Sequence, residues 1–563
     1  MSLRGKPQDA RNNGVMKDKY LELMKKALSA YTDEHIHEYF NRVKTEGLTE
    51  HGFPRLTVNI GVLVAHGYRQ DLIPLFVEMM DFCCEQIPKV KAANDFSVRE
   101  IVFCLFELKK QGKFLSDIER WTKQLSMIVP EKCYDKFAKN PNDAMGNWAL
   151  FSALSEFARQ KLTGCDSEAF VDLQLENQLH RLDENGMYRD NLKHEAHQPI
   201  VYDLVPRYLF TLLLHFGYRG RFYERIDSML KNTALMTLKM QSITGEIAFG
   251  GRSNQFIHNE GLLAIIFEFE ANRYAGQGDL VTAGKFKAAI SRAMEVTDYW
   301  LEREPTRHIK NRFPTETKYG CEKYAYFDKY MITTASHIFS AYMICDDSIE
   351  ASAYEDSDSY FMTSDHFHKL FMRSGGYFLE FDTYADPHYD SSGLGRVHRY
   401  GAPSPICMSL PCPGNPNYSI CTNEKIRASL CPGKVIDGEP VFTCDIDEKI
   451  NVTDVSCNSA ALDYPLGLKA DYKISKEGVN VTVTGDGNLL HMIPAFSYDG
   501  EKETDITLID NVLQIKYDGW ICQYTSNGKI LEIGKTARNR NGFYKLFYAE
   551  SYNSLSVNIK IFK

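Results

Sequence analysis

The chain has 563 residues, of which 44% are apolar and 25% are charged. At roughly 100–200 residues per domain, this length predicts two to four domains or one large architecture, and it excludes a small binding module. Disorder and a continuous coiled coil are excluded for most of the chain by its composition. Acidic residues outnumber basic ones by 74 to 65, and the net charge of −9 is not gathered into long runs. We therefore expect no nucleic-acid partner, and an acidic ligand would need a local basic pocket.

No stretch approaches ~18 consecutive apolar residues, and the first residues are polar, so the sequence predicts neither a membrane partner nor a signal peptide. The 14 cysteines are scattered without a CxxC pair. Free thiols in a reducing compartment are the simplest interpretation, and we expect a cytoplasmic protein. Because cysteines concentrate between residues 407 and 457, disulfides and export after removal of a leader stay open as the alternative.

Between residues 15 and 345, apolar residues recur at helical spacing, as in Leu209, Leu212, Leu213 and Phe216. Breaks rich in glycine and proline divide this part into about eleven helices joined by short loops. Such regular spacing favours paired helices, which can close into an α/α toroid. The ends of the inner helices would then form a cleft suited to an extended chain molecule.

From about residue 359, short alternating strands replace the helical pattern. The strand-like segments are 371–381, 479–484, 506–509 and 556–561, with turn residues such as Asp486-Gly487 and Asn527-Gly528. A run of helices followed by a run of strands predicts separate domains rather than βαβ units. The expected fold is α+β: a toroid over 15–345, an acidic linker over 346–358, and a sandwich-like antiparallel β domain over 359–563.

The densest polar segment spans residues 186–208. Its polar members are Tyr188, Arg189, Asp190, His194, His197, Tyr202, Asp203 and Arg207. Imidazole, phenol and guanidinium groups at the mouth of a helical scaffold can remove a proton and stabilise the resulting anion. The alternative is an ordinary loop whose tyrosines and arginines cap neighbouring helices.

A second polar cluster spans residues 245–260. Its polar members are Glu246, Arg252, Ser253, Asn254, Gln255, His258, Asn259 and Glu260. Gly250-Gly251 allows a close backbone approach, and Ser253 is expected to cap the helix that follows. On that helix Asn254 and His258 would share a face near the N-terminus, where an anion is favoured. This predicts a carboxylate or sugar-hydroxyl site, with a glycine turn and solvated polar residues as the alternative.

Three further segments offer ligand contacts. The ring of Trp148 can stack on a sugar while the amide of Asn147 binds its carboxylate, although a tryptophan at a helix start is more often core. Tyr324 lies in an aromatic run over 319–326 that offers stacking or a phenolic acid, with core packing as the alternative. Polar loops over 382–390 and 396–399, the latter containing His398, can close over the cleft.

Metal and phosphate signals are weak. The pairs His366–His368 and His194–His197 lack an HExxH context, and GxxxxGK[ST], GxGxxG and GxSxG motifs do not occur. We therefore expect no cofactor.

This layout resembles the polysaccharide lyases of the heparinase II/III and chondroitin-lyase type and related toroid glycoside hydrolases, which join an α/α toroid to antiparallel β domains. The resemblance implies an enzyme that cleaves uronate-containing poly- or oligosaccharides by β-elimination. It implies that Asn147 neutralises the carboxylate and that His197 and Tyr202 act as base and acid, with Arg207 beside them. Tyr188 or His258 could replace one of these residues. The implied substrate-binding residues are Arg189, Arg207, Arg252, Asn254, Gln255, His258, Trp148, Tyr324 and His398.

In the heparinase-like branch, the β domain often carries a histidine-rich metal motif. The comparable stretch here, 395–401, contains only His398, so a structural metal in the β domain is an open alternative rather than an expectation.

Two other functions stay open. A glycoside hydrolase, such as a uronidase, would need two carboxyl groups at the cleft, for which Asp190, Asp203, Glu246 and Glu260 are available. A non-catalytic glycan-binding protein would need the aromatic residues alone. In each case the expected partner is an acidic oligosaccharide or polysaccharide, short chains being favoured by the overall negative charge.

Overall fold

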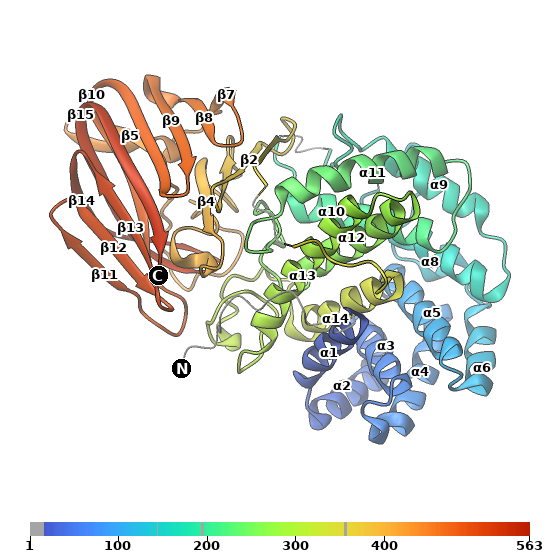
Figure 1. The fold of residues 1–563 in the computed structure, drawn as a ribbon. Helices are drawn as coiled ribbons and strands as arrows, with labels where there is room; N and C mark the ends of the chain where they lie inside the picture. The colour runs from blue at the N-terminus through green and yellow to red at the C-terminus, as the bar shows by residue number, and fades with distance from the viewer. Residues whose placement is uncertain (1–15, 144, 193–195, 354–356) are drawn as a thin grey trace.

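The computed structural model describes residues 16–143, 145–192, 196–353 and 357–563. Its N-terminal part is helical and its C-terminal part consists of antiparallel strands, so the predicted α+β fold is confirmed (Figure 1). Within those ranges, none of the helices combines the length and hydrophobicity that a membrane span requires. All 14 cysteines are free thiols, including those between residues 407 and 457.

The described residues contain fourteen α-helices. They are α1 Met16–Ser29, α2 Asp33–Glu46, α3 Gly52–Ala65, α4 Ile73–Gln86, α5 Asn94–Lys110, α6 Leu115–Leu125, α7 Pro130–Cys133, α8 Trp148–Thr163, α9 Glu168–Leu179, α10 Ile200–His215, α11 Tyr223–Met240, α12 Asn259–Gly276, α13 Leu280–Leu301 and α14 Phe327–Ile344. The sequence pattern predicts about eleven because it does not mark every break. Thr32, whose side chain caps α2, and Gly67, with φ of 82°, separate helices that the apolar pattern joins.

Six helices form a closed inner ring. α3 packs against α5, α5 against α8, α8 against α10, α10 against α12, α12 against α14, and α14 returns to α3. Outside this ring, α4 packs on α3, α9 on α8, α11 on α10, α13 on α12 and α1 on α14. Every residue of α3 is buried, as expected of a helix that is surrounded by others. This is the predicted α/α toroid.

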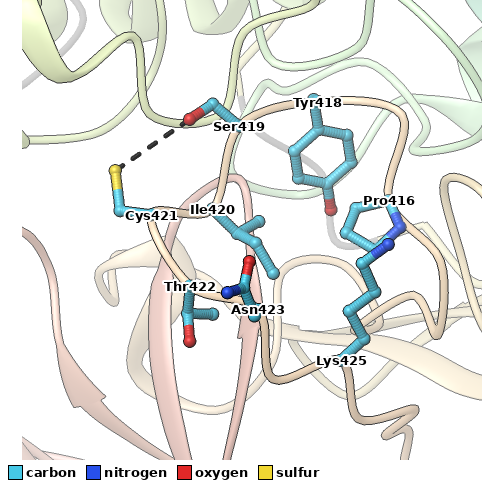
Figure 2. A pocket seen from close by; sticks show the side chains of 8 residues that line it. All are labelled: Pro416, Tyr418, Ser419, Ile420, Cys421, Thr422, Asn423 and Lys425. Carbon is cyan, nitrogen blue, oxygen red and sulfur yellow. Dashed lines mark hydrogen bonds between the residues drawn. The ribbon is translucent and has the colours of Figure 1, made fainter.

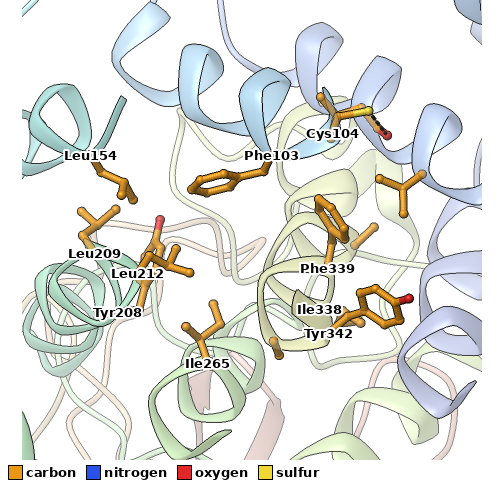
Figure 3. Packing of buried hydrophobic residues seen from close by; sticks show 14 of the residues in the cluster. Phe103, Cys104, Leu154, Tyr208, Leu209, Leu212, Ile265, Ile338, Phe339 and Tyr342 are labelled. Carbon is orange, nitrogen blue, oxygen red and sulfur yellow. Dashed lines mark hydrogen bonds between the residues drawn. The ribbon is translucent and has the colours of Figure 1, made fainter. Parts of the chain in front are cut away.

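The ring interior is apolar. Side chains from five inner helices point toward a common centre in Figure 3, among them Phe103, Leu154, Leu212, Ile265 and Phe339. Each of α3, α8, α10 and α12 leads through a short connection into the outer helix that packs on it, so the two helices of each pair run antiparallel. All six inner helices therefore point the same way, and their N-terminal ends lie together.

The β part contains two antiparallel sheets. The smaller has the order β1-β2-β3-β4: β1 Ser359–Met362, β2 Lys369–Ser374, β3 Tyr377–Asp382 and β4 Gly393–Arg399. The larger has eleven strands: β5 Pro432–Ile436, β6 Glu439–Phe442, β7 Asn451–Val455, β8 Ser459–Tyr464, β9 Leu468–Ser475, β10 Gly478–Tyr498, β11 Asp505–Ile509, β12 Val512–Tyr517, β13 Trp520–Ser526, β14 Lys529–Asn539 and β15 Gly542–Phe562. One apolar core covers both halves of β10 and β15.

The two longest strands, β10 and β15, pair along most of their length. β9 and β13 flank the first half of β10 and the second half of β15, whereas β5 and β14 flank their other halves. The register shifts between Thr484 and Asn488, so a bulge lies where the sequence predicts a turn at Asp486-Gly487. That turn prediction is wrong: the strand bends and continues, with Gly487 at φ of 88°.

The β part lies against the N-terminal ends of the inner helices. Gln198, just before α10, donates its N–H to the carbonyl of His366 at 2.9 Å. Gly251, in the segment before α12, donates its N–H to Asp390 at 2.8 Å. The buried side chain of Arg396 reaches the carbonyl of Ile247 at 2.8 Å. The segments that precede α10 and α12 are therefore enclosed between helices and strands.

Candidate active site

The N-terminal ends of the inner helices form one polar face, which we call the mouth. It is continuous from helix to helix: the ring of His51, before α3, lies 4.7 Å from that of Phe96 in α5, which lies 4.8 Å from that of Trp148 in α8. Each helix N-terminus presents unpaired N–H groups and a partial positive charge. Six such ends favour a negatively charged ligand at the mouth.

Two tyrosines at the mouth are joined through one serine. The hydroxyl of Tyr202 in α10 shares a hydrogen bond of 3.2 Å with that of Ser253, which shares one of 2.7 Å with Tyr324. Tyr202 and Tyr324 are both half-buried. Hydroxyl groups linked in this way can pass protons between two points of a ligand.

Arg252 lies beside this network. Its guanidinium group is 4.0 Å from the ring centre of Tyr202, and it forms an ion pair with Asp190. Burial raises the pKa of Tyr202 above its ordinary value, while the positive charge of Arg252 and the hydrogen bond with Ser253 oppose that rise. The side chain of Arg252 is 39% exposed, so it can also reach a ligand.

Asn147 is placed next to the same group. A β-carbon placed on Gly146 would lie 3.8 Å from Oδ1 of Asp190, so the turn before α8 adjoins the Arg252–Asp190 pair. The Asn147 side chain does not cap α8. Trp148 is half-buried, with the ammonium group of Lys136 4.3 Å from its ring centre. The structure thus brings Asn147, Trp148, Tyr202, Arg252 and Tyr324 to the mouth.

The segment before α12 differs from its prediction. α12 begins at Asn259, so the expected capping of a helix by Ser253 is wrong, and Asn254 and His258 do not share a helical face. Residues 251–258 form turns instead, with Ser253 and Gln255 at φ of 59° and 68°. Glycine in front of these residues permits the close approach but does not start a helix.

Asn254, Gln255 and His258 lie beneath the mouth surface and are buried. Asn254 donates to the carbonyl of Ala248 at 3.1 Å and accepts from Gln255 at 2.8 Å. The ring of His258 lies 5.5 Å from that of Tyr330, and burial holds the pKa of His258 well below its ordinary value. These residues therefore lie beneath the layer that contains Tyr202, Ser253 and Tyr324.

His197 is directed toward the β part. Its ring centre lies 4.8 Å from that of Tyr384 and 6.0 Å from that of His368. The structure therefore places His197 on the strand side of the mouth, next to the loop after β3. His194 lies outside the described residues.

Four residues of the 186–208 segment are engaged beneath the mouth. Tyr188 is fully buried and donates its hydroxyl to Gln178 at 2.5 Å. Asp203 and Arg207 form a buried ion pair of 2.5 Å, and Arg207 also donates to Thr237 at 2.6 Å. Arg189 donates to the carbonyl of Arg181 at 3.1 Å. These contacts hold α9, α10 and α11 together.

Glu246, Glu260 and His398 lie in a buried contact between the two parts. Lys310 pairs with Glu260 at 2.6 Å, and the hydroxyl of Ser404 donates to Glu246 at 2.5 Å. Both ring nitrogens of His398 are engaged, Nδ1 with Ser242 at 2.6 Å and Nε2 with Ser409 at 3.0 Å. Across the described ranges no cluster of three or more His, Cys, Asp or Glu side chains has the arrangement of a metal site.

Sequence patterns did not indicate several residues of the mouth. Glu322 accepts the N–H of Ser253 at 2.7 Å and is held by Arg540, which lies 218 residues further along the chain. Tyr330 lies against Tyr324, with ring centres 6.2 Å apart. The ring of Phe96 joins that of Trp148. No local signal marks such contacts. The one available signal is position, because Phe96 lies in the first turn of α5 and Tyr330 in the first turn of α14.

Two surface cavities lie away from the tyrosine pair. One, of about 470 Å³, is lined by the loop from Pro416 to Lys425 (Figure 2). The other, of about 600 Å³, lies between the loop 182–186 and α11. The first adjoins the mouth indirectly, because the ring of Tyr418 on its wall lies 4.0 Å from the guanidinium group of Arg540.

No protein-family model and no curated protein match the chain. Among solved structures, heparinase III aligns over 90% of this chain and 76% of its own, at 8% identity and a TM-score of 0.49. A heparan sulfate lyase HepC mutant from Pedobacter heparinus aligns over 91% and 76%, at 11% identity and a TM-score of 0.45. The chondroitin AC lyase of Streptomyces coelicolor A3 aligns over 99% and 80%, at 10% identity and a TM-score of 0.49. All three TM-scores lie below 0.5, so the fold is described from the ring of helices and the two sheets of this chain itself.

Proposed function

We propose that this protein is a carbohydrate-active enzyme that cleaves uronate-containing glycans by β-elimination at the mouth. The observation that carries the proposal is the pair of tyrosines, Tyr202 and Tyr324, joined through Ser253 and flanked by Arg252. Removal of a proton and protonation of a leaving group are the two acid–base steps that this reaction needs.

The carboxylate of the substrate would be bound by Arg252 and Asn147 at the convergent helix N-termini. Neutralising that carboxylate makes the C5 proton more acidic, because the charge that develops in the transition state is shared with the carboxyl group. The same cation lies against the ring of Tyr202 and favours its phenolate. We therefore assign Tyr202 as the base.

In the reaction, Tyr202 takes the C5 proton, the C5–H electron pair forms the C4–C5 double bond, and the C4–O4 bond breaks. The departing O4 receives a proton from Tyr324. Ser253 can then return the proton from Tyr202 to Tyr324, because its hydroxyl contacts both phenols. His197, on the strand side, is assigned to substrate binding rather than to proton transfer.

The four carboxyl groups that a hydrolase could use are already engaged by other side chains, which favours β-elimination over hydrolysis. Asp203 and Glu260 are buried in ion pairs with Arg207 and Lys310. Glu246 is buried and bonded to Ser404, and Asp190 is paired with Arg252. Hydrolysis would need two carboxyl groups facing one glycosidic bond. The phenol groups, rather than these carboxyl groups, are free to serve a ligand.

The test is incubation with a set of uronate-containing oligosaccharides. We expect an ultraviolet absorbance from the conjugated double bond, which Tyr202→Phe abolishes and Tyr552→Phe, in a tyrosine that is 70% exposed on β15, leaves unchanged. New reducing ends without that absorbance would contradict the proposal in favour of hydrolysis. Binding without either signal would leave a glycan-binding protein.

A further inference from the structure

The hairpin between β14 and β15 reaches from the β part into the mouth. Its turn consists of Arg540 and Asn541, between the paired residues Asn539 and Gly542. Asn539 fixes the turn by accepting the N–H groups of Asn541 and Gly542 at 2.9 and 3.2 Å. All four residues are buried, although the hairpin belongs to the larger sheet of the β part (Figure 1).

Arg540 holds Glu322 by a two-pronged contact. Its Nη2 donates to Oε1 of Glu322 at 2.7 Å and its Nη1 donates to Oε2 at 3.0 Å. Nη1 also donates to the carbonyl of Gly320 at 2.5 Å. Such planar pairing fixes the orientation of the carboxylate as well as its position. Both side chains are almost fully buried, so the geometry is not averaged by solvent.

Glu322 in turn holds the backbone of Ser253. Its Oε1 accepts the Ser253 N–H at 2.7 Å, while the Ser253 carbonyl accepts from the side chain of Asn259 at 3.0 Å. Ser253 has φ of 59°, a left-handed conformation that costs energy in a residue with a side chain. The conformation persists because its surroundings impose it, and it directs the serine hydroxyl to the two tyrosines.

Asn541, the other turn residue, holds the second left-handed position of the same segment. Its side-chain amide donates to Oε1 of Gln255 at 3.3 Å and to the carbonyl of Lys310 at 2.8 Å. Gln255 has φ of 68°. Two neighbouring residues of one hairpin turn thus restrain two strained residues of one mouth segment.

We propose that Arg540 is a positioning residue of the active site: through Glu322 it fixes the left-handed turn at Ser253 and so keeps the serine hydroxyl between Tyr202 and Tyr324. This rests on the proposed function for its catalytic consequence, but not for the restraint itself. The β part then contributes to proton transfer without touching the substrate.

Arg312 offers a matched control. It is a buried arginine of the helical part that pairs with a carboxylate of the β part. Its Nε lies 3.1 Å from Asp499, and both side chains are as buried as those of the Arg540 pair to within a few per cent. Among the described residues, the side chain of Arg312 contacts Asp499, Glu501, Asp518 and Tyr299, and none of these contacts Ser253. Arg312→Met therefore removes a comparable ion pair without releasing the mouth segment.

The first measurement is amide hydrogen exchange over residues 251–257. We expect Arg540→Met and Glu322→Gln to speed exchange there about tenfold or more, since a restraining partner is lost, and Arg312→Met to leave it within about twofold. Unchanged exchange in both Arg540→Met and Glu322→Gln overturns the proposal. Glu322→Gln has the same shape as glutamate, so it decides the matter if Arg540→Met does not fold.

The second measurement is steady-state turnover. We expect kcat of Arg540→Met to fall about 10- to 100-fold with KM within about threefold, because the hydroxyl network is displaced while carboxylate binding is kept. Guanidinium ion should restore part of the kcat of Arg540→Ala and none of that of Glu322→Gln. If Arg540→Met has the same kcat as Arg312→Met, the positioning role of Arg540 is overturned. If the wild-type protein forms no unsaturated product, the proposed function fails, and the exchange experiment still decides whether Arg540 holds the turn.

Discussion

Tyr202 and Asp203 are consecutive residues of α10, yet they belong to two groups with opposite surroundings. The mouth group contains Tyr202 with Arg252 and Asp190; the core group contains Asp203 with Arg207 and Tyr188. Both consist of a tyrosine, an arginine and an aspartate. In the core group the ionic side chains are at most 1% exposed, whereas Arg252 is 39% exposed. Accessibility and free bonding capacity, not composition, separate a reactive group from a structural one.

The largest difference should come from removing one hydroxyl from each group. We expect Tyr202→Phe to lower kcat about 10²- to 10⁴-fold with little change in stability, because it deletes the proposed base. Tyr188→Phe should keep kcat and lose about 1–3 kcal/mol of unfolding free energy, because Gln178 loses its hydrogen-bond donor. Initial rates and urea unfolding curves check this. An equal loss of kcat in Tyr202→Phe and Tyr188→Phe would contradict the view that only the mouth group is reactive.

Removing each arginine should separate the groups by stability. Arg207→Met leaves Asp203 as a buried unpaired charge, so we expect a loss of about 3–5 kcal/mol with kcat per folded molecule retained. Arg252→Met should cost less stability than Arg207→Met, because Arg252 is 39% exposed, and should lower kcat/KM about tenfold or more through weaker carboxylate binding. Thermal unfolding and rate measurements on the same preparations give both values. A strongly destabilised Arg252→Met would place Arg252 with the core group.

The pH dependence sharpens the role of Arg252. A base must be deprotonated, so kcat/KM should rise with pH until the phenol of Tyr202 ionises. The charge of Arg252 lowers the pKa of Tyr202 against the effect of burial. Arg252→Met should therefore move this rise to higher pH, because the charge that lowers the pKa of Tyr202 is removed. A shift to lower pH, or none, would show that Arg252 does not act on the base.

The smallest effect is expected at His197. It lies beside Tyr384 and His368 rather than beside the hydroxyl network. His197→Ala should raise KM about threefold to tenfold and change kcat less, as expected for a residue that binds the substrate. A loss of kcat as large as that of Tyr202→Phe would return His197 to the role of base, which the family resemblance implies.

The local spacing of apolar residues was enough to predict a helical part followed by a part made of strands, because helices and strands each have a short characteristic period. It did not separate α1 from α2, although the cap of α2 by Thr32 is a local contact with His35. It also did not show that Asp486-Gly487 lies within a bulged strand, because a bulge depends on the partner strand. Four polar segments singled out from the sequence do begin or precede inner helices. Their division into core and mouth was not predictable, since it depends on partners that are distant in sequence. Arg207 donates to Thr237 of α11, and Ser253 is held by Glu322, which Arg540 holds in turn.

The closure of the ring by α14 on α3 has a consequence for how the chain reaches its fold. These helices are more than two hundred and fifty residues apart in sequence (Gly52–Ala65 and Phe327–Ile344), so their contact is among the most non-local in the helical part. Closing a loop of this length costs conformational entropy before any native contact forms, so this contact is expected to form slowly. Until residue 344 has left the ribosome, α3, buried on every residue in the finished ring, lacks one of its neighbours. The growing chain must therefore carry an open, apolar edge through about half of its synthesis, and the hairpin that restrains the mouth arrives only afterwards.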